Sequence, residues 1–266
     1  MSSVLAFPMY AVNRSETLAL RQAVFALLQA RGVIIHERSP AWPEGDLLSH
    51  WRQPDLILSQ TCGYPLVTAL PDVQVVGCFE YTAPGCEGVD YRSLLAVREE
   101  DKRLALADFR GRRAVCNSAD SQSGYNALLK TIAPLAVKGR FFERVHFSGS
   151  HRQSLIYVKR GQGDIAAVDC VTWALLARHE PQLLDGLAVM GQTPLAPGLP
   201  LITSGKTSPE ALAILRDALH TLASAPRYKD VCDSMLIGGF KATSRQPYSL
   251  LLDWRGEAEK QGVTGL

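Results

Sequence analysis

Short apolar runs alternate with amphipathic stretches along the chain, which is typical of an α/β protein. Over Leu18–Ala30 the apolar residues recur at helical spacing and Gly32 follows, which predicts a helix that ends there. The same pattern predicts a short helix at Leu47–Trp51. The strands predicted in this first set are Val4–Met9, Val33–Glu37, Asp55–Ser59, Val73–Phe79 and Tyr91–Val97.

A second α/β set begins after Arg98, where the charged run Glu99–Arg103 is typical of a solvated linker or surface turn. Its predicted strands are Arg113–Asn117, Val145–Ser148, Ile165–Asp169 and Leu187–Thr193. Its predicted helices are Gly124–Leu135, His151–Arg160 and Val171–His179. The remaining predicted elements are a strand at Leu199–Ser204 and helices at Pro209–Ala223, Tyr228–Ile237 and Tyr248–Lys260.

This order of elements predicts two lobes. Residues 98–197 would form a second lobe, inserted into a discontinuous first lobe of residues 1–97 and 198–266. Strands near 91–97 and 199–204 would cross between the lobes and form a hinge. The chain has 266 residues, of which 47% are hydrophobic, and this is enough for two cores of ordinary size.

Charge and hydropathy exclude several classes of protein. The net charge of +2 is too small to indicate a nucleic-acid partner. No apolar run reaches the roughly 18 residues of a transmembrane helix. Residues Met1–Pro8 have neither the basic segment nor the apolar core of a secretory signal, so either the sequence has been trimmed or the protein stays in the cytoplasm.

Motifs for metals, nucleotides and redox chemistry are missing from the sequence. The six cysteines form no CxxC pair, and no P-loop, G-x-G-x-x-G, H-E-x-x-H or EF-hand pattern occurs, so neither a metal nor a cofactor is predicted. Cys78 and Cys86 flank a Pro-Gly turn. They could form a disulfide in an oxidising compartment, or they could be separate thiols.

The segment from Asn117 to Asn126 is rich in serine and lies between a predicted strand and a predicted helix. Ser121 and Ser123 can cap that helix, and Gly124 leaves its backbone open to a ligand. The first N–H groups of a helix have no partner within it, and the helix dipole favours an anion there. The segment therefore suits a phosphate, sulfate or carboxylate group, although it could also be an ordinary serine cap.

The segment Ser148–His151 has the same arrangement before the next predicted helix. The dipole disfavours protonation of His151, so a neutral imidazole could donate one N–H to an oxyanion. Catalysis by a serine–histidine pair has no support from a G-x-S-x-G motif. Asp169 ends a strand and could either bind a ligand group or cap the helix that follows.

Four side chains of the first set are further ligand candidates, because each lies at the start or end of a predicted strand. A tyrosine can both pack against a ligand and donate to it, and a threonine can donate. Taken one by one, a structural role is the more common one for such residues. These candidates are Tyr10, Thr61, Tyr64 and Tyr91.

In these segments the sequence resembles the phosphate/phosphite/phosphonate-binding proteins of ABC transporters, a branch of the type II periplasmic binding proteins. The resemblance rests on order and spacing over most of the chain. The matching segments are Pro8–Tyr10, Gln60–Pro65, Tyr91–Val97, Leu106–Asn117, Ser121–Gly124, Phe141–Phe142, Ser148–His151 and Gly163–Asp169.

The resemblance implies a fold of two lobes, each a mixed sheet flanked by helices, with two hinge-crossing strands and closure over the ligand. It implies that Ser121, Gln122 and Ser123 grip the ligand oxygens and that His151 joins them. Tyr91 matches a tyrosine of the family's crossing strand, and Tyr64 matches its loop aromatic. Asp169 matches an acidic residue that meets an amino group on some ligands. No carboxylate lies at Ala196–Pro200, which speaks against an aminoalkyl ligand.

The function that this resemblance implies is capture of phosphate, phosphite or a phosphonate in the periplasm, by a monomer that performs no chemistry and delivers its ligand to a membrane permease. Neither a cofactor nor nucleic acid takes part. Two alternatives stay open: an oxyanion sensor or regulatory module that uses the same clamp, and an enzyme on the same fold.

Overall fold

The computed structural model describes residues 4–35, 42–43 and 45–266. The chain divides into two compact units, each of which contains segments that are far apart in the sequence. Unit 1 consists of Met1–Thr82, Cys86–Asp90 and Pro197–Tyr248. Unit 2 consists of Ala83–Gly85, Tyr91–Ala196 and Ser249–Leu266. Strands β4 (Asp90–Tyr91) and β10 (Ala196–Pro197), which pair with each other, carry two of the passages between units.

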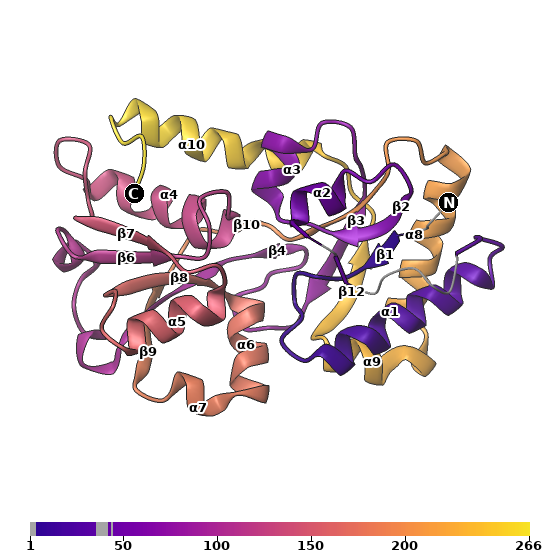
Figure 1. Ribbon diagram of the computed structural model, residues 1–266, viewed down its shortest axis with the longest axis horizontal. Coiled ribbons are helices and arrows are strands. Elements are labelled where there is room, and N and C mark those ends of the chain that lie inside the picture. The colour runs from indigo at the N-terminus through magenta and orange to yellow at the C-terminus, as the bar shows by residue number, and fades with distance from the viewer. Residues whose placement is uncertain (1–3, 36–41, 44) are drawn as a thin grey trace. The chain divides into compact units, whose positions relative to one another are not determined.

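Unit 1 is built on a five-stranded mixed sheet with the order β1-β2-β11-β3-β12 (Figure 1). The strands β1 and β2 are parallel, β11 runs antiparallel to β2 and β3, and β12 runs antiparallel to β3. The strands are β1 (Val4–Ala6), β2 (Leu56–Gln60), β3 (Gln74–Tyr81), β11 (Pro200–Thr203) and β12 (Ile237–Lys241). The helices are α1 (Arg14–Gln29), α2 (Leu47–Trp51), α3 (Gly63–Ala69), α8 (Pro209–Ser224) and α9 (Lys229–Ser234), with 3₁₀ turns at Pro226–Tyr228 and Gln246–Ser249.

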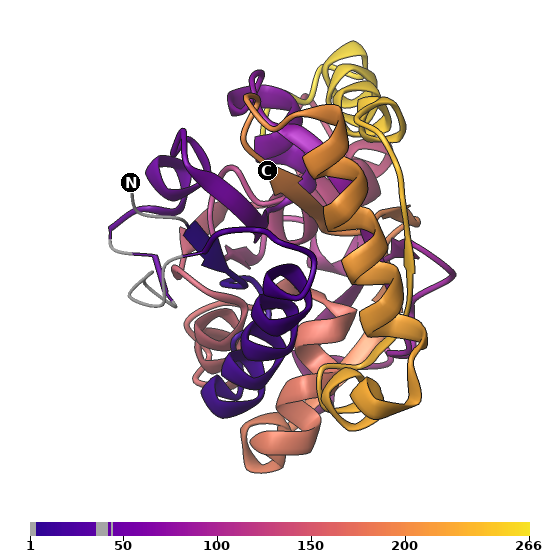
Figure 2. The same ribbon diagram turned by 90° about the vertical axis from the view of Figure 1, so that its right-hand side faces the viewer.

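Helix α1 shows how the apolar pattern produces this packing. The Asn13 side chain accepts hydrogen bonds from the N–H groups of Ser15 and Glu16 and so caps the first turn. Leu20, Val24 and Leu27, on one face, are buried. Figure 2 shows α1 and α8 next to each other, and the two helices are in contact.

Unit 2 has a second five-stranded sheet, with the order β7-β6-β8-β5-β9. The strands β7, β6 and β8 are parallel, and β5 runs antiparallel to both β8 and β9. The strands are β5 (Ser93–Arg98), β6 (Arg113–Cys116), β7 (Arg144–Phe147), β8 (Ile165–Asp169) and β9 (Leu187–Gln192). The helices are α4 (Ala127–Ile132), α5 (His151–Lys159), α6 (Cys170–His179), α7 (Pro181–Leu184) and α10 (Leu250–Lys260), with a π-helical turn at Gln122–Asn126 and 3₁₀ turns at Glu99–Asp101, Leu106–Phe109 and Ala133–Leu135.

The core of unit 2 lies between its sheet and α4. Leu95 and Val97, two residues apart on β5, point to the same face and pack in one cluster with Leu128 and Leu129 of α4. Figure 1 shows α4 and α10 on one side of this sheet and α5 and α6 on the other. Ala258 of α10 belongs to the same cluster, so the C-terminal helix is part of this core.

The structure differs from the predicted elements at several places, including α7, which was not predicted, and β1, which ends at Ala6 instead of Met9. The helix predicted at Tyr228–Ile237 ends at Ser234, because Leu236 has a left-handed φ of 58° and the chain continues as β12. The helix α3 (Gly63–Ala69) was not predicted, and it begins within the segment Gln60–Pro65. Residues 33–35 of the predicted strand Val33–Glu37 are not a strand, and residues 36–37 lie outside the described residues.

The unit boundaries also differ from the predicted lobes. The prediction placed residues 91–97 and 249–266 in the first lobe, but both segments are in unit 2. Hydrogen bonding is the reason for the first difference, since β5 pairs with β8 and β9 along its length. Core packing is the reason for the second, because Ala258 and Val263 are buried in the unit 2 cluster.

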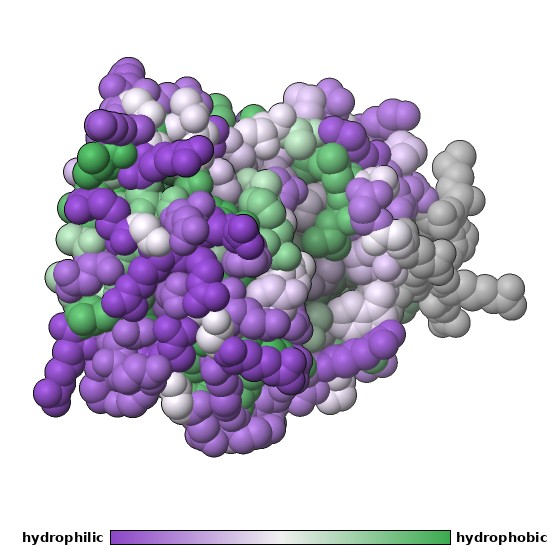
Figure 3. Space-filling view, turned by 60° about the vertical axis from the view of Figure 1, so that its left-hand side comes forward, coloured by the Kyte–Doolittle hydropathy of each residue, from purple (hydrophilic) through white to green (hydrophobic). Residues whose placement is uncertain are grey.

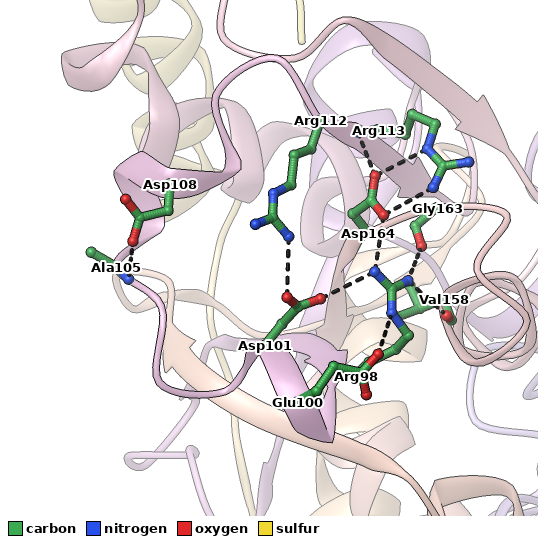
Figure 4. A network of polar contacts seen from close by, with 10 residues as sticks. All are labelled: Arg98, Glu100, Asp101, Ala105, Asp108, Arg112, Arg113, Val158, Gly163 and Asp164. Atoms are coloured by element: carbon green, nitrogen blue, oxygen red, sulfur yellow. Dashed lines mark hydrogen bonds and ion pairs between the residues drawn. The ribbon is translucent and has the colours of Figure 1, made fainter.

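The charged run after β5 anchors the strand rather than forming only a solvated turn (Figure 4). The Arg98 guanidinium donates to Asp164 at 3.1 Å, to Asp101 at 3.1 Å and to the Gly163 carbonyl at 2.8 Å. Asp164 also accepts from the backbone N–H of Arg113 at 2.9 Å and from its side chain at 3.0 Å. These contacts join the end of β5 to the starts of β6 and β8.

The surface that Figure 3 shows is mainly hydrophilic, with separate hydrophobic areas. Within residues 4–35, 42–43 and 45–266, no helix is long and apolar enough to cross a membrane. The large apolar side chains that the structure exposes are scattered along the chain. They are Ile34, Leu47, Val137, Phe147, Val189, Leu250 and Leu252.

Candidate functional site

The topology of unit 2 brings several candidate side chains to one edge of its sheet. Because β6, β7 and β8 are parallel, their carboxyl ends lie at the same edge, and ligands of open α/β sheets bind there. The loop to Ser121–Ser123 follows β6, His151 follows β7, and Asp169 ends β8. Ser93 begins the antiparallel β5 and lies opposite Asp169, so it is at this edge as well.

Ser123 and His151, which the sequence placed in two separate segments, make direct contact. The distance between Ser123 Oγ and His151 Nε2 is 2.8 Å. Ser121 Oγ accepts a hydrogen bond from the Gly124 N–H at 3.0 Å, which caps the π-helical turn. The backbone N–H of Ser123 has no acceptor within its own helix, because it lies in the first turn.

His151 is a neutral imidazole near neutral pH. Burial lowers the pKa of His151 to about 4. Its Nδ1 atom is buried and has no hydrogen-bond partner in the described part of the chain. A neutral imidazole has one N–H, and either this N–H or the Ser123 hydroxyl is used in the bond between the two residues, so the pair presents one free donor without adding a net charge. Such donors suit an oxyanion.

Asn117 is a polar residue at this edge for which the sequence predicted no role of its own. Its backbone oxygen accepts from the Gly149 N–H at 2.9 Å and so joins the loops after β6 and β7. Its Oδ1 is buried, and no described group donates to it. A Cβ atom at Gly124 would lie 1.9 Å from Asn117 Oδ1, so a larger residue here would displace the Asn117 side chain.

Ser93 and Thr193 are also missing from the predicted site. Ser93 Oγ donates to the Ser123 carbonyl at 2.9 Å, and the Ser93 N–H donates to Thr193 Oγ1 at 2.9 Å. A hydroxyl at the start of a strand that is otherwise apolar (Leu94–Val97) was the available signal, because a buried hydroxyl needs a hydrogen-bond partner.

Two predicted ligand residues of unit 2 have structural contacts. Gln122 is fully buried, and its Oε1 accepts from Asn126 Nδ2 at 2.8 Å. Asp169 Oδ1 accepts from the N–H groups of Val171 and Thr172 at 2.8 and 3.1 Å, which is the helix-capping role. Tyr91 is buried beside this edge. Ligand contacts of these residues stay predictions.

The other three candidates belong to unit 1 and lie near the end of β2 or after β1. Thr61 is fully buried, and its N–H donates to the Pro200 carbonyl at 3.0 Å. Tyr64 lies in the first turn of α3 and is half-buried. Tyr10 is buried, with its ring edge-on to Tyr81 at 5.0 Å between centroids. Their ligand roles stay predictions.

Cys78 and the metal-binding residue types are candidates for other kinds of site in the described part of the chain. Cys78 Sγ donates to the Leu199 carbonyl at 3.4 Å, and burial raises the pKa of Cys78 to about 12, so it is an unreactive thiol. Among the residues that the structure describes, no group of three or more His, Cys, Asp and Glu side chains could hold a metal ion.

The fold is that of the periplasmic binding proteins, and three solved structures show this over almost the whole chain. A binding protein component of an ABC phosphonate transporter from Pseudomonas aeruginosa has a TM-score of 0.77 and 18% identity, covering 98% of this chain and 88% of that one. PhnD1 from Prochlorococcus marinus, in complex with methylphosphonate, has a TM-score of 0.76 and 16% identity, covering 97% and 99%. XAC2383 from Xanthomonas citri, bound to ATP, has a TM-score of 0.71 and 17% identity, covering 98% of each.

The sequence itself gives the narrower assignment. Residues 53–248 match the sequence profile of the family described as "ABC transporter, phosphonate, periplasmic substrate-binding protein", and the chain belongs to this family. No curated protein sequence matches it. The predicted family and the predicted two-lobed α/β fold are therefore confirmed.

Proposed function

We propose that this protein binds a small phosphate-like oxyanion, namely phosphate, phosphite or a simple phosphonate, and delivers it to the membrane permease of an ABC transporter. Family membership supports the transport role. The observation that carries the ligand class is the hydrogen bond of 2.8 Å between Ser123 and a neutral His151 at the carboxyl edge of the unit 2 sheet.

The chemistry of this pair favours capture over reaction. Serine hydroxyl, imidazole N–H and first-turn backbone N–H groups are all donors, and a tetrahedral oxyanion has several acceptor oxygens. The backbone N–H groups of α5, which begins at His151, lie at the same edge. Neutral donors hold an anion by many hydrogen bonds and let it leave again intact.

Thermal-shift measurements test the ligand class, because a ligand of the native state raises the melting temperature by mass action. The panel is phosphate, phosphite, methylphosphonate, aminoethylphosphonate, sulfate and taurine. We expect a shift from at least one of phosphate, phosphite and methylphosphonate. A shift from sulfate or taurine alone would show that the proposed ligand class is wrong.

The double variant Ser123→Ala/His151→Ala tests the site, and we expect it to remove most of the shift. The matched control is Ser224→Ala/His220→Ala, which removes an exposed serine and an exposed histidine from α8 of unit 1. The control should keep the full shift. An unchanged response in the first variant would place the ligand elsewhere.

A further inference from the structure

We propose that Ser93 is a positioning residue for the oxyanion site, which it serves by fixing the backbone of Ser123. The inference rests on the proposed function, since it concerns the same site. Ser93 is not expected to touch the ligand. It acts through Ser123, whose carbonyl accepts the Ser93 hydroxyl at 2.9 Å.

The backbone of Ser93 is held in place by hydrogen bonds that do not involve its side chain. Its N–H donates to Thr193 Oγ1 at 2.9 Å, and its carbonyl accepts from the Thr193 N–H at 2.9 Å. Thr193 follows the last residue of β9, so these bonds join the start of β5 to the end of the adjacent strand β9. Ser93 and Thr193 are only 1% and 2% exposed, so water does not compete for these bonds.

The direction of the Ser93 side chain follows from the strand. Ser93 and Leu95 are two residues apart on β5 and point to the same face of the sheet. Leu95 packs against Leu128 and Leu129 of α4, so this is the face that the α4 segment covers. The Ser93 hydroxyl therefore meets the backbone at the start of that segment, at Ser123.

Ser123 is held through both its backbone carbonyl and its side-chain hydroxyl. Its carbonyl accepts from Ser93, and its hydroxyl contacts His151 Nε2 at 2.8 Å. The turn in which it lies is π-helical, since the N–H of Asn126 bonds at 3.0 Å to the Ser121 carbonyl, five residues earlier. A chain of hydrogen bonds thus runs from Thr193 through Ser93 and Ser123 to His151, and a shift of the Ser123 backbone would misplace its hydroxyl.

The positioning role predicts a spectroscopic effect without any ligand. The Nε2 ¹⁵N shift of His151, measured in the ¹⁵N-histidine-labelled protein and assigned with His151→Gln, senses its bond to Ser123. We expect Ser93→Ala to move this shift toward the value in Ser123→Ala. The matched control is Thr203→Val, which removes another fully buried strand hydroxyl, one that donates to the Leu56 carbonyl in unit 1. It should leave the His151 shift in place.

The second measurement is calorimetric titration with methylphosphonate. We expect Ser93→Ala to weaken binding about fivefold, the value of one neutral hydrogen bond, and Thr203→Val to leave it unchanged. Urea unfolding of both variants corrects for their loss of stability. An unchanged His151 shift in Ser93→Ala, or an equal change in Thr203→Val, would overturn the inference. If the wild-type protein binds none of phosphate, phosphite and methylphosphonate, the proposed function fails, but the His151 shift still decides whether Ser93 positions Ser123.

Discussion

His151 should make the stability of this protein depend on pH in a predictable direction. Burial lowers the pKa of His151 to about 4 in the folded protein, whereas an unfolded histidine titrates near 6.5. Above pH 6.5 neither state binds the proton, and stability is full. As the pH falls from 6.5 to 4, the unfolded chain takes up a proton that the folded state does not, so the free energy of unfolding decreases.

The size of this loss follows from the two pKa values. A difference of about 2.5 pKa units at about 1.4 kcal/mol per unit gives about 3 kcal/mol over the whole range. Most of it falls between pH 6.5 and 4.5. This is a large share of the stability of an ordinary domain, which is about 5–15 kcal/mol.

Urea unfolding of the wild type and of His151→Gln at pH 7.5 and 4.5 measures the loss of stability that is due to His151. The free energy of unfolding should fall by about 2–3 kcal/mol more in the wild type than in the variant. Burial also lowers the pKa of His50, which bonds to Ser59 in unit 1, but this histidine is present in both proteins and cancels in the difference. An equal loss in the two proteins would refute the reasoning, as would a His151 pKa near 6.5 in an NMR titration.

Further substitutions test other contacts by urea unfolding. Gly124→Ala should lower the free energy of unfolding by about 1–3 kcal/mol, because its Cβ would lie 1.9 Å from Asn117 Oδ1. Gly256→Ala on α10 would place a Cβ with nothing within 4 Å and should raise the free energy of unfolding by about 0.5–1 kcal/mol. Equal effects of the two variants would contradict this. Burial alone would raise the pKa of Asp164, but its hydrogen bonds to two arginines outweigh burial and lower this pKa to about 2. Asp164→Asn should therefore lower the free energy of unfolding by about 1–2 kcal/mol at pH 7, and this loss should be present above pH 4 and fade as the pH falls to 2. Glu100→Gln, at an exposed carboxylate, should change the free energy of unfolding little. A loss in Asp164→Asn that does not depend on pH would contradict the assignment.

Local patterns predicted most of the secondary structure. The apolar spacing gave α1 and the buried strand β8, because burial of one helix face or of a whole strand is encoded in adjacent residues. The strand β12 was missed because Gly238 and Gly239 have no preference for a strand. Its pairing with β3 comes from residues about 160 positions earlier, which no local window contains.

The candidate site was predictable only in part, for a similar reason. A serine-rich segment and a histidine at a helix start could each be recognised alone, and the resemblance joined them. The contact from Ser93 to Ser123 spans 30 residues of sequence and depends on which strand pairs with which. The close approach of the Asn117 side chain to Gly124 depends on how the loop after β6 folds back, which residue types alone do not specify.

The position of α10 bears on the order in which the protein matures as it is synthesised. Every segment of unit 1 has been made once Tyr248 emerges, but unit 2 still lacks α10 and the residues after it, which add Ala258 and Val263 to its core. The unit that occupies the middle of the gene product is therefore the last to be completed. A nascent chain would carry a unit 2 with an incomplete core until Val263 has left the ribosome.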